Sequence, residues 1–344
     1  MTGPSFNRFT SVRPQAVRLT QRDLVRTSYL DAERKFPLLI EPNHEGIDPV
    51  SYAESNRETF ETNLAREGAI LFRGFDFGSV ERFQAFVGAL SGGALEYTER
   101  SSPRSRVGGN IYTSTDYPPE YPIFLHNEQS YNLVFPRKIL FYCLKSAEAG
   151  GATPIADCRR ILAGIPAGIR EKFERLGYAY VRNFGDGFGL SWRDAFQTDD
   201  RAAVEAYCAA AQIEHEWKSG GRLRTRQVRR TTAIHPLSGE ARWFNHLTFF
   251  HVSTLVPAVR DSVLRELGEE NLPNNTYYGD GSPIEPEVMD TLHALYEKET
   301  FVFPWRDGDV LVLDNMLVAH GREPFRGARK VVVGMGDPTP WSAV

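Results

Sequence analysis

The sequence predicts an α+β protein whose core is mainly β structure, with flanking helices and inserted helical segments. After residue 106, many short runs rich in β-branched and aromatic residues are separated by proline and glycine, which is typical of antiparallel strands. A helix, a strand and a second helix precede these runs, and segments with helical periodicity lie between the later strands. Because the chain shows no internal repeat and no clean linker, we expect one domain with insertions rather than two domains.

The elements at the start of the chain are expected to be an arm and a helix–strand–helix unit. Residues 1–35 are predicted to form an N-terminal arm, and residues 36–344 a single domain. The arm is typical of a solvated terminal segment because, in the first thirty residues, acids are few and arginines recur at Arg8, Arg13, Arg18, Arg22 and Arg26. The domain opens with an amphipathic helix over 51–68, closed by Gly68, then an apolar strand over 69–75 and a helix over 79–90.

The later elements are predicted to be strands flanked by inserts. We expect helical insertions around residues 157–230 and 257–300, which include helical patterns over 201–217 and 285–300. The strands are expected within 107–115, 123–132, 138–147, 242–252, 300–305, 309–320 and 329–336. The inserts therefore flank the β core, where they can serve as lids over a site.

Composition and charge exclude several classes of protein. The chain has 344 residues, of which 41% are apolar and 24% charged, as in an ordinary soluble globular protein. A net charge of −4 gives no general attraction to nucleic acid or to anionic membranes. No apolar run approaches the roughly 20 residues of a membrane span, and the N-terminus lacks the pattern of a signal peptide. Cys143, Cys158 and Cys208 are too few for a disulfide framework, so we expect a cytoplasmic protein with core thiols.

A histidine and a carboxylate stand two positions apart in the apolar stretch FLHNEQSYN, residues 124–132. In an extended strand, residues i and i+2 point to the same face, so the side chains of His126 and Glu128 are expected to converge. A buried carboxylate costs several kcal/mol unless a partner or a metal ion takes up its charge. The pair therefore calls for a third ligand. For an isolated pair, the alternative is a hydrogen-bonded couple that holds a turn.

The third candidate is His320, which lies between two apolar strands in DNMLVAHGREPFRGARKVVV, residues 314–333. Two histidines and one carboxylate are the set that leaves three positions of an octahedral Fe(II) open. The open positions allow an oxo-acid and dioxygen to bind one iron together. Arg329 is placed to pair with the far carboxylate of that oxo-acid, and Thr153 in GGATPIAD to add a hydroxyl.

These motifs resemble the TauD/TfdA family of Fe(II)/2-oxoglutarate-dependent oxygenases. The segments HNE, GGATPIAD and DNMLVAHGREPFRGARKVVV carry the resemblance, and GGNIYTSTDYP and WFNHLTFFHVS are similar to stretches of its SyrP-like branch, which is associated with nonribosomal peptide pathways. The similarity runs from about residue 36 to the C-terminus. One difference is Glu128, because many relatives carry aspartate at that position.

The resemblance implies a double-stranded β-helix, the jelly-roll fold of clavaminate synthase-like proteins. It also implies Fe(II) held by His126, Glu128 and His320, with 2-oxoglutarate held by Thr153 and Arg329 and dioxygen as the second cosubstrate. The implied reaction is hydroxylation of an unactivated C–H bond, commonly at the β-carbon of an amino acid. The amino acid is either free or carried on a peptidyl carrier protein, in specialised metabolite biosynthesis.

Other polar residues of the sequence have both a functional and a structural interpretation. Asn110 and Tyr112, just before the motif strand, and Arg226, in the basic run GGRLRTRQVRR, are candidates for substrate binding, with core, turn and solvated-face roles as the alternatives. Arg322 is expected to pair with an acid across its loop and to lie outside the site. Three further histidines are interpreted as a hairpin residue and two strand residues rather than ligands: His235, His246 and His251.

Three other functions remain open on the sequence. An epoxidase or a desaturase would use the same iron site and differ only in the product. A zinc hydrolase would use the same types of ligand, but Arg329 and Thr153 would then have no task. A non-catalytic β-sandwich binding protein would bind no iron and form no succinate.

Overall fold

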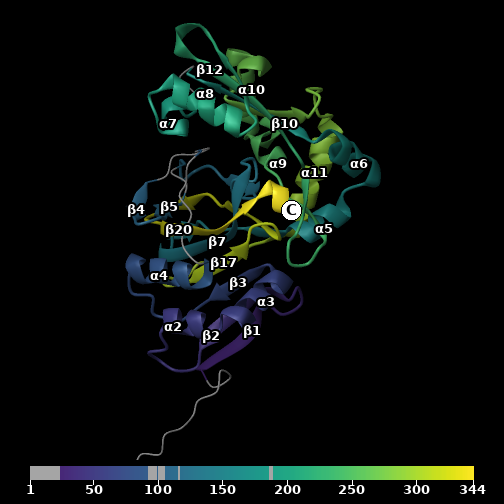
Figure 1. Cartoon of the computed structure of the whole chain (residues 1–344). Coiled ribbons are helices and arrows are strands. Elements are labelled where there is room, and N and C mark those ends of the chain that lie inside the picture. The colour runs from purple at the N-terminus through teal and green to yellow at the C-terminus, as the bar shows by residue number, and fades with distance from the viewer. Residues whose placement is uncertain (1–23, 92–98, 100–104, 115–116, 186–188) are drawn as a thin grey trace, which may run out of the picture.

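The structure is a computed structural model that describes residues 24–91, 99, 105–114, 117–185 and 189–344, with the elements shown in Figure 1. Residues 1–23, most of the predicted arm, lie outside the described residues. The larger sheet of the core has eight strands. In spatial order they are β1 (Val25–Asp31), β2 (Phe36–Pro42), β3 (Ala69–Phe72), β17 (Val310–Asp314), β7 (Val134–Lys145), β20 (Lys330–Pro340), β5 (Ile111–Thr113) and β4 (Arg106–Gly108).

A second, four-stranded sheet packs against the first. Its order is β16 (Thr300–Phe301), β9 (Ile155–Asp157), β18 (Val318–Arg322) and β6 (Ile123–His126). Ile155 and Val318 from this sheet share one buried apolar cluster with Ile139, Phe141 and Leu313 from the large sheet. Burial of this apolar surface between two sheets is what holds a jelly roll together. The predicted β core is therefore confirmed as a two-sheet sandwich.

Three N-terminal helices cover the outer face of the large sheet. They are α2 (Pro49–Ser55), α3 (Arg57–Glu67) and α4 (Val80–Ser91), and their buried side chains join Ile70, Leu140 and Val312 in a second apolar cluster. The helix predicted over 51–68 is interrupted at Asn56, but it ends at Gly68 as expected. Gly68 has φ +82° and its amide bonds the Leu64 carbonyl, a helix ending that favours glycine.

Most of the inserted segments lie on the side of the molecule away from α2 and α3 (Figure 1). They form a layer that packs on the small sheet of the core, because their buried side chains share an apolar cluster with Leu125, Ala156 and Ala319. Their helices are α5 (Cys158–Gly164), α6 (Ala167–Leu176), α7 (Trp192–Phe196), α8 (Arg201–Ala210), α10 (Pro257–Leu267) and α11 (Pro286–Glu299). Helix α9 (Leu247–Phe250), which lies between the two predicted insertions in sequence, belongs to the same layer. They also contain an antiparallel sheet, in the order β11 (Glu214–Trp217), β12 (Leu223–Arg229), β10 (Tyr178–Phe184) and β15 (Asn274–Tyr278). The sequence pattern predicted helical inserts. The structure shows that the inserts contain a sheet as well as helices.

Two further predictions differ from the structure. Residues 25–31, expected within the arm, form strand β1, which pairs antiparallel with β2 and extends the large sheet. Residues 242–252 were expected to be a strand, but only β14 (Ala241–Trp243) is extended, and it pairs with β13 (Thr232–Ile234). The chain then enters α9, in which Leu247, Thr248 and Phe250 are buried. Aromatic residues favour strands only weakly and according to context, so burial in a helical turn can override that preference. Two short strands, β8 (Ala149–Gly150) and β19 (Phe325–Arg326), form a last pair.

The three cysteines are buried free thiols, as expected. Burial raises the pKa of Cys143 and of Cys158 to about 12, so both stay protonated at neutral pH. They therefore behave as small apolar core residues rather than as nucleophiles.

Candidate metal centre and cosubstrate cavity

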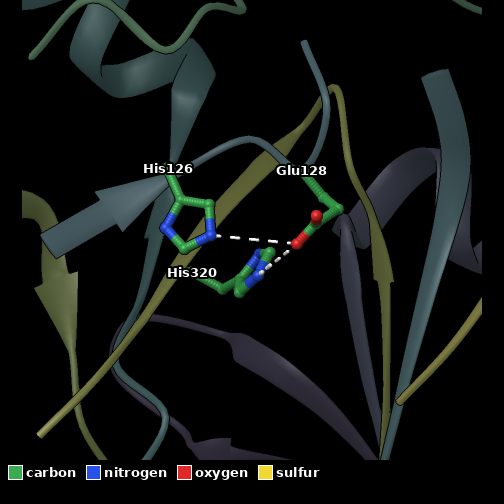
Figure 2. A group of neighbouring side chains, drawn as sticks. All are labelled: His126, Glu128 and His320. Atoms are coloured by element: carbon green, nitrogen blue, oxygen red, sulfur yellow. Dashed lines mark ion pairs between the residues drawn. The ribbon is translucent and has the colours of Figure 1, made fainter. Parts of the chain in front are cut away.

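His126, Glu128 and His320 come together in one buried cluster (Figure 2). Glu128 Oε2 lies 3.9 Å from His126 Nε2 and 3.9 Å from His320 Nε2. One ligand atom from each residue lies within 4.8 Å of the other two. Among the described residues, this is the one group of three or more metal-ligating side chains that converges in this way.

Strand pairing positions the two histidines. His320 on β18 lies directly opposite His126, the last residue of β6, so their imidazoles leave the sheet side by side, with ring centroids 4.5 Å apart. Glu128 does not lie on the strand, which contradicts the reasoning from strand alternation. The chain turns after His126, and Gln129 has φ +52°, so a turn brings the carboxylate back towards the histidines.

The donor set fits a metal ion. Both carboxylate–imidazole distances are too long for hydrogen bonds, which require about 3.2 Å or less. Two ligand atoms that are each about 2.1 Å from one ion and at right angles to each other lie about 3 Å apart. The observed distances are 3.9 Å, so side-chain movements of about 1 Å would bring the three ligand atoms to the spacing that a metal ion requires. The Phe124 carbonyl accepts a 2.8 Å hydrogen bond from His126 Nδ1. That nitrogen therefore carries the hydrogen, and Nε2 presents its lone pair to the cluster.

A cavity of about 390 Å³, counting the space at its mouth, opens beside the two histidines. It lies between the two sheets, and its wall combines ligand-type, cationic and apolar side chains: Ser114, Ile123, His126, Phe141, Thr153, His320, Gly321, Arg322, Arg329 and Val333. The cavity therefore joins the metal-type cluster to two arginines and two hydroxyl groups, which suits a small dianion that also ligates a metal.

Arg329 lies in this cavity with its guanidinium held in place. Its Nε donates to the Gly151 carbonyl at 2.8 Å, and one terminal nitrogen donates to Ser114 Oγ at 3.3 Å. Within the described residues, no carboxylate pairs with Arg329, and the guanidinium N–H groups that are not used in these two bonds remain for a ligand. Burial, and then the positive charge of Arg322, lower the pKa of Arg329 to about 10. The group stays charged at neutral pH and favours an incoming anion.

Thr153 is oriented by a residue that the sequence did not suggest. Trp305 Nε1 donates to Thr153 Oγ1 at 3.0 Å, and both side chains are buried. Because this bond uses the hydroxyl oxygen as an acceptor, the hydroxyl hydrogen is available to a ligand in the cavity. Ser114 was missed in the same way, although it lies within the segment GGNIYTSTDYP. A hydroxyl on a short strand end carries no periodic signal, so only the fold identifies it.

Arg322 was expected outside the site, but it lines the cavity. Its terminal nitrogens donate to the main-chain carbonyls of Tyr117, Pro118 and Tyr121 at 2.7–2.9 Å. Arg322 thus ties the segment before β6 to the strand that carries His320. Its charge also acts on Arg329, as the pKa of Arg329 shows.

The three candidates for substrate binding lie elsewhere. Tyr112 is buried in the apolar cluster between the sheets, and Asn110 accepts a 3.0 Å hydrogen bond from Arg106. Arg226, on β12 of the inserted sheet, forms an ion pair with Glu214 at 2.8 Å and donates to the Gly279 carbonyl at 2.7 Å. In the part of the chain that the structure describes, none of the three lines the cavity.

The other histidines stand outside the cluster. His235 lies in the hairpin between β13 and β14, and its Nε2 is 3.1 Å from Asp314 Oδ2. His246 and His251 flank helix α9, so their interpretation as strand residues is wrong. His246 packs 5.2 Å from the His126 ring, between centroids, and its Nδ1 is hydrogen-bonded to Ser130. It supports the cluster without being one of its three converging groups.

Comparison with known proteins identifies the family of the chain. Residues 34–335 match the family described as "Taurine catabolism dioxygenase TauD, TfdA family". The chain belongs to this family. It is 45% identical over 280 residues to the dapdiamide synthesis protein DdaC of Enterobacter agglomerans, covering 81% of this chain and 85% of that protein. A clavaminate synthase-like protein of Arabidopsis thaliana is 28% identical over 296 residues, covering 82% and 85%.

Solved structures agree on the fold. PvcB of Pseudomonas aeruginosa, described as an Fe, alpha-ketoglutarate dependent oxygenase, aligns with a TM-score of 0.55 at 16% identity over 94% of each chain. AAD-2, solved with Mn(II) and N-oxalylglycine, aligns with a TM-score of 0.51 at 13% identity over 92% of this chain and 99% of that one.

Membership in the TauD/TfdA family confirms the predicted jelly-roll fold and the predicted enzyme class, an iron- and 2-oxoglutarate-dependent dioxygenase. The alternatives of a zinc hydrolase and a non-catalytic binding protein are thereby excluded. The helices that the structure describes include none with the length and apolar character of a membrane span.

Proposed function

We propose that this TauD/TfdA oxygenase hydroxylates an unactivated C–H bond of an amino acid, either free or carried on a carrier protein, in a biosynthetic pathway. The observation that carries the proposal is that His126 and His320, which converge with Glu128 in one buried cluster, line the same cavity as Arg329. A redox metal centre and an anchor for an acidic cosubstrate thus share one small space.

Each residue of the site has a proposed task. His126, Glu128 and His320 hold Fe(II), and Glu128 offsets part of its charge in a buried setting. Arg329 pairs with the distal carboxylate of 2-oxoglutarate through its free donors, and Thr153 adds a hydrogen bond. When bound, iron activates dioxygen and couples the conversion of 2-oxoglutarate into succinate and carbon dioxide to oxidation of the substrate.

The protein's own contribution is to hold these groups and to exclude water. The Phe249 ring packs 4.6 Å from His126, and the Phe141 ring packs 5.0 Å from His320, between ring centroids. These aromatic walls limit the rotation of both imidazoles and shield them from bulk solvent. The inserted layer that contributes Phe249 therefore gives the substrate side of the site its enclosure.

The substrate class rests on relatives. DdaC, at 45% identity, is described as a synthesis protein for dapdiamide, which supports a biosynthetic rather than a catabolic role for this chain. The motif resemblance to the SyrP-like branch supports an amino acid, including one tethered to a peptidyl carrier protein.

The test is an aerobic incubation of the Fe(II)-loaded enzyme and 2-oxoglutarate with a panel of amino acids, free and loaded on a carrier protein, under isotope-labelled dioxygen. Hydroxylation predicts one product heavier than a saturated substrate by one labelled oxygen atom, together with succinate. A product lighter by two hydrogen atoms would indicate desaturation, and oxygen transfer only to unsaturated analogues would indicate epoxidation. His320→Ala protein is the control for reactions of free iron.

A further inference from the structure

The main chain of Glu128 lies in an unusual place for a metal ligand. His126 and His320 are fixed by direct pairing of strands β6 and β18, but β6 ends at His126. Glu128 is two residues past that end, and none of the strands in the described part of the chain has it in its pairing register. Something else must satisfy its buried N–H and C=O, because unpaired peptide groups are costly in a protein interior.

The side chain of Asn315 takes that place. Its Oδ1 accepts a 2.8 Å hydrogen bond from the Glu128 amide, and its Nδ2 donates to the Glu128 carbonyl at 2.9 Å. The same Nδ2 donates to the Pro136 carbonyl at 2.8 Å. A carboxamide offers one acceptor and two donors, so it replaces the peptide group that a neighbouring strand would supply. Only this orientation of the amide satisfies all three bonds.

Asn315 is itself firmly held. It lies in the turn between β17 and β18, and none of its surface is exposed. The main-chain N–H of Asn315 donates to the Arg137 carbonyl at 2.7 Å, and the main-chain carbonyl of Asn315 accepts a 2.7 Å hydrogen bond from Asn127 Nδ2. The strand that begins after this turn carries His320. One side chain therefore ties the main chain of the carboxylate ligand to the element that presents the second histidine.

We propose that Asn315 is the positioning residue for the carboxylate ligand of the metal centre. The inference rests on the proposed role of Glu128, and it assigns to Asn315 a task that a general packing role would not include. Without the carboxamide, Glu128 keeps its chemistry but loses the position that aims its carboxylate at the two imidazoles. Groups that orient a ligand typically contribute about 10- to 100-fold to metal affinity.

The experiment measures Mn(II) and Ni(II) binding by calorimetry on metal-free full-length protein, native and variant, with thermal unfolding of each. Asn315→Ala removes all three bonds. Asn315→Asp keeps the shape and the bond from the Glu128 amide but loses the donor, so it carries the test if the alanine variant does not fold. Asn183→Ala is the control, because Asn183 Nδ2 also donates to two main-chain carbonyls, at 2.8 and 3.0 Å, but in the inserted layer.

We expect Mn(II) affinity to fall roughly 10- to 100-fold in both Asn315 variants and to stay within about twofold of native in the control. Adding Asn315→Asp to a Glu128→Ala background should leave Ni(II) affinity unchanged, since Ni(II) binds a histidine pair tightly enough to be measured there. Folded Asn315 variants with native affinity would overturn the inference, as would an equal loss in the Glu128→Ala background. If native protein takes up neither ion, the metal centre itself is contradicted.

Discussion

Replacing Arg329 with glutamine should weaken the binding of 2-oxoglutarate while leaving the metal-type cluster intact. The guanidinium is already fixed by the Gly151 carbonyl and by Ser114, so little side-chain freedom is lost when it pairs with a carboxylate. A hydrogen bond to a charged group contributes about 1.5–3 kcal/mol. Since each 1.4 kcal/mol is a factor of about ten, affinity should fall roughly tenfold to a hundredfold.

The assay is an anaerobic calorimetric titration of 2-oxoglutarate into Fe(II)-loaded protein, followed by the KM for 2-oxoglutarate under turnover. Arg329→Lys should lie between native and glutamine, because it keeps the charge but loses the planar fork. Arg326→Gln, an exposed arginine outside the cavity, is the matched control. Unchanged affinity in Arg329→Gln would refute the assignment of the anchor and direct attention to Arg322.

The pH dependence of this binding has a defined sign. The Arg329 pKa is lowered to about 10, and the group is positively charged below that value and neutral above it. Affinity for 2-oxoglutarate should therefore be maintained around neutral pH and should fall as the pH rises through about 10. The fall should be absent from Arg329→Gln protein, which has no charge to lose at this position.

Three further changes have specific expected outcomes. Glu128→Gly protein should lose most of its oxygenation activity, and mass spectrometry should detect no chlorinated product in high chloride. An opened coordination position does not by itself rebuild the surroundings that hold a halide. Chlorination by native protein would contradict the assignment of Glu128 as a ligand. Thr153→Val should lower the free energy of unfolding in urea by about 1–3 kcal/mol, because the buried Trp305 Nε1–H loses its acceptor. The same change should weaken 2-oxoglutarate binding. Native stability together with native affinity for 2-oxoglutarate would contradict the role of Thr153 in the site. Arg73→Met should cost about 3–5 kcal/mol in urea unfolding, because it leaves Asp309 buried without the 2.6 Å ion pair, whereas iron affinity should not change.

The strongest predictions came from residues whose chemistry is unusual for their surroundings. A histidine and an acid in an apolar run, followed much later by a histidine between two apolar strands, indicated a shared site, and the structure brings these three side chains together. The reason for convergence was only half anticipated. Strand pairing aligns His126 with His320, but Glu128 reaches them through a turn. In that turn Gln129 has a left-handed backbone conformation, and such a turn leaves no periodic pattern in the sequence.

The rest of the site depends on contacts between distant segments. Trp305 orients Thr153 across 152 positions of sequence, and Asn315 holds Glu128 across 187. Such contacts are decided by how the two sheets pack, so local propensity cannot reveal them. The candidates Asn110, Tyr112 and Arg226 were chosen for nearness in sequence or for charge, and the fold places their side chains on other partners.

The most direct test of the metal centre is anaerobic titration of Fe(II) into native, His126→Ala and His320→Ala proteins, followed by 2-oxoglutarate and dioxygen with succinate as the readout. Native protein should bind one iron per chain and form succinate. Each variant should lose stoichiometric iron binding and succinate formation together, because two remaining ligands hold Fe(II) too weakly. Retention of iron and of turnover in both variants would contradict the assignment of His126, Glu128 and His320 as the iron ligands.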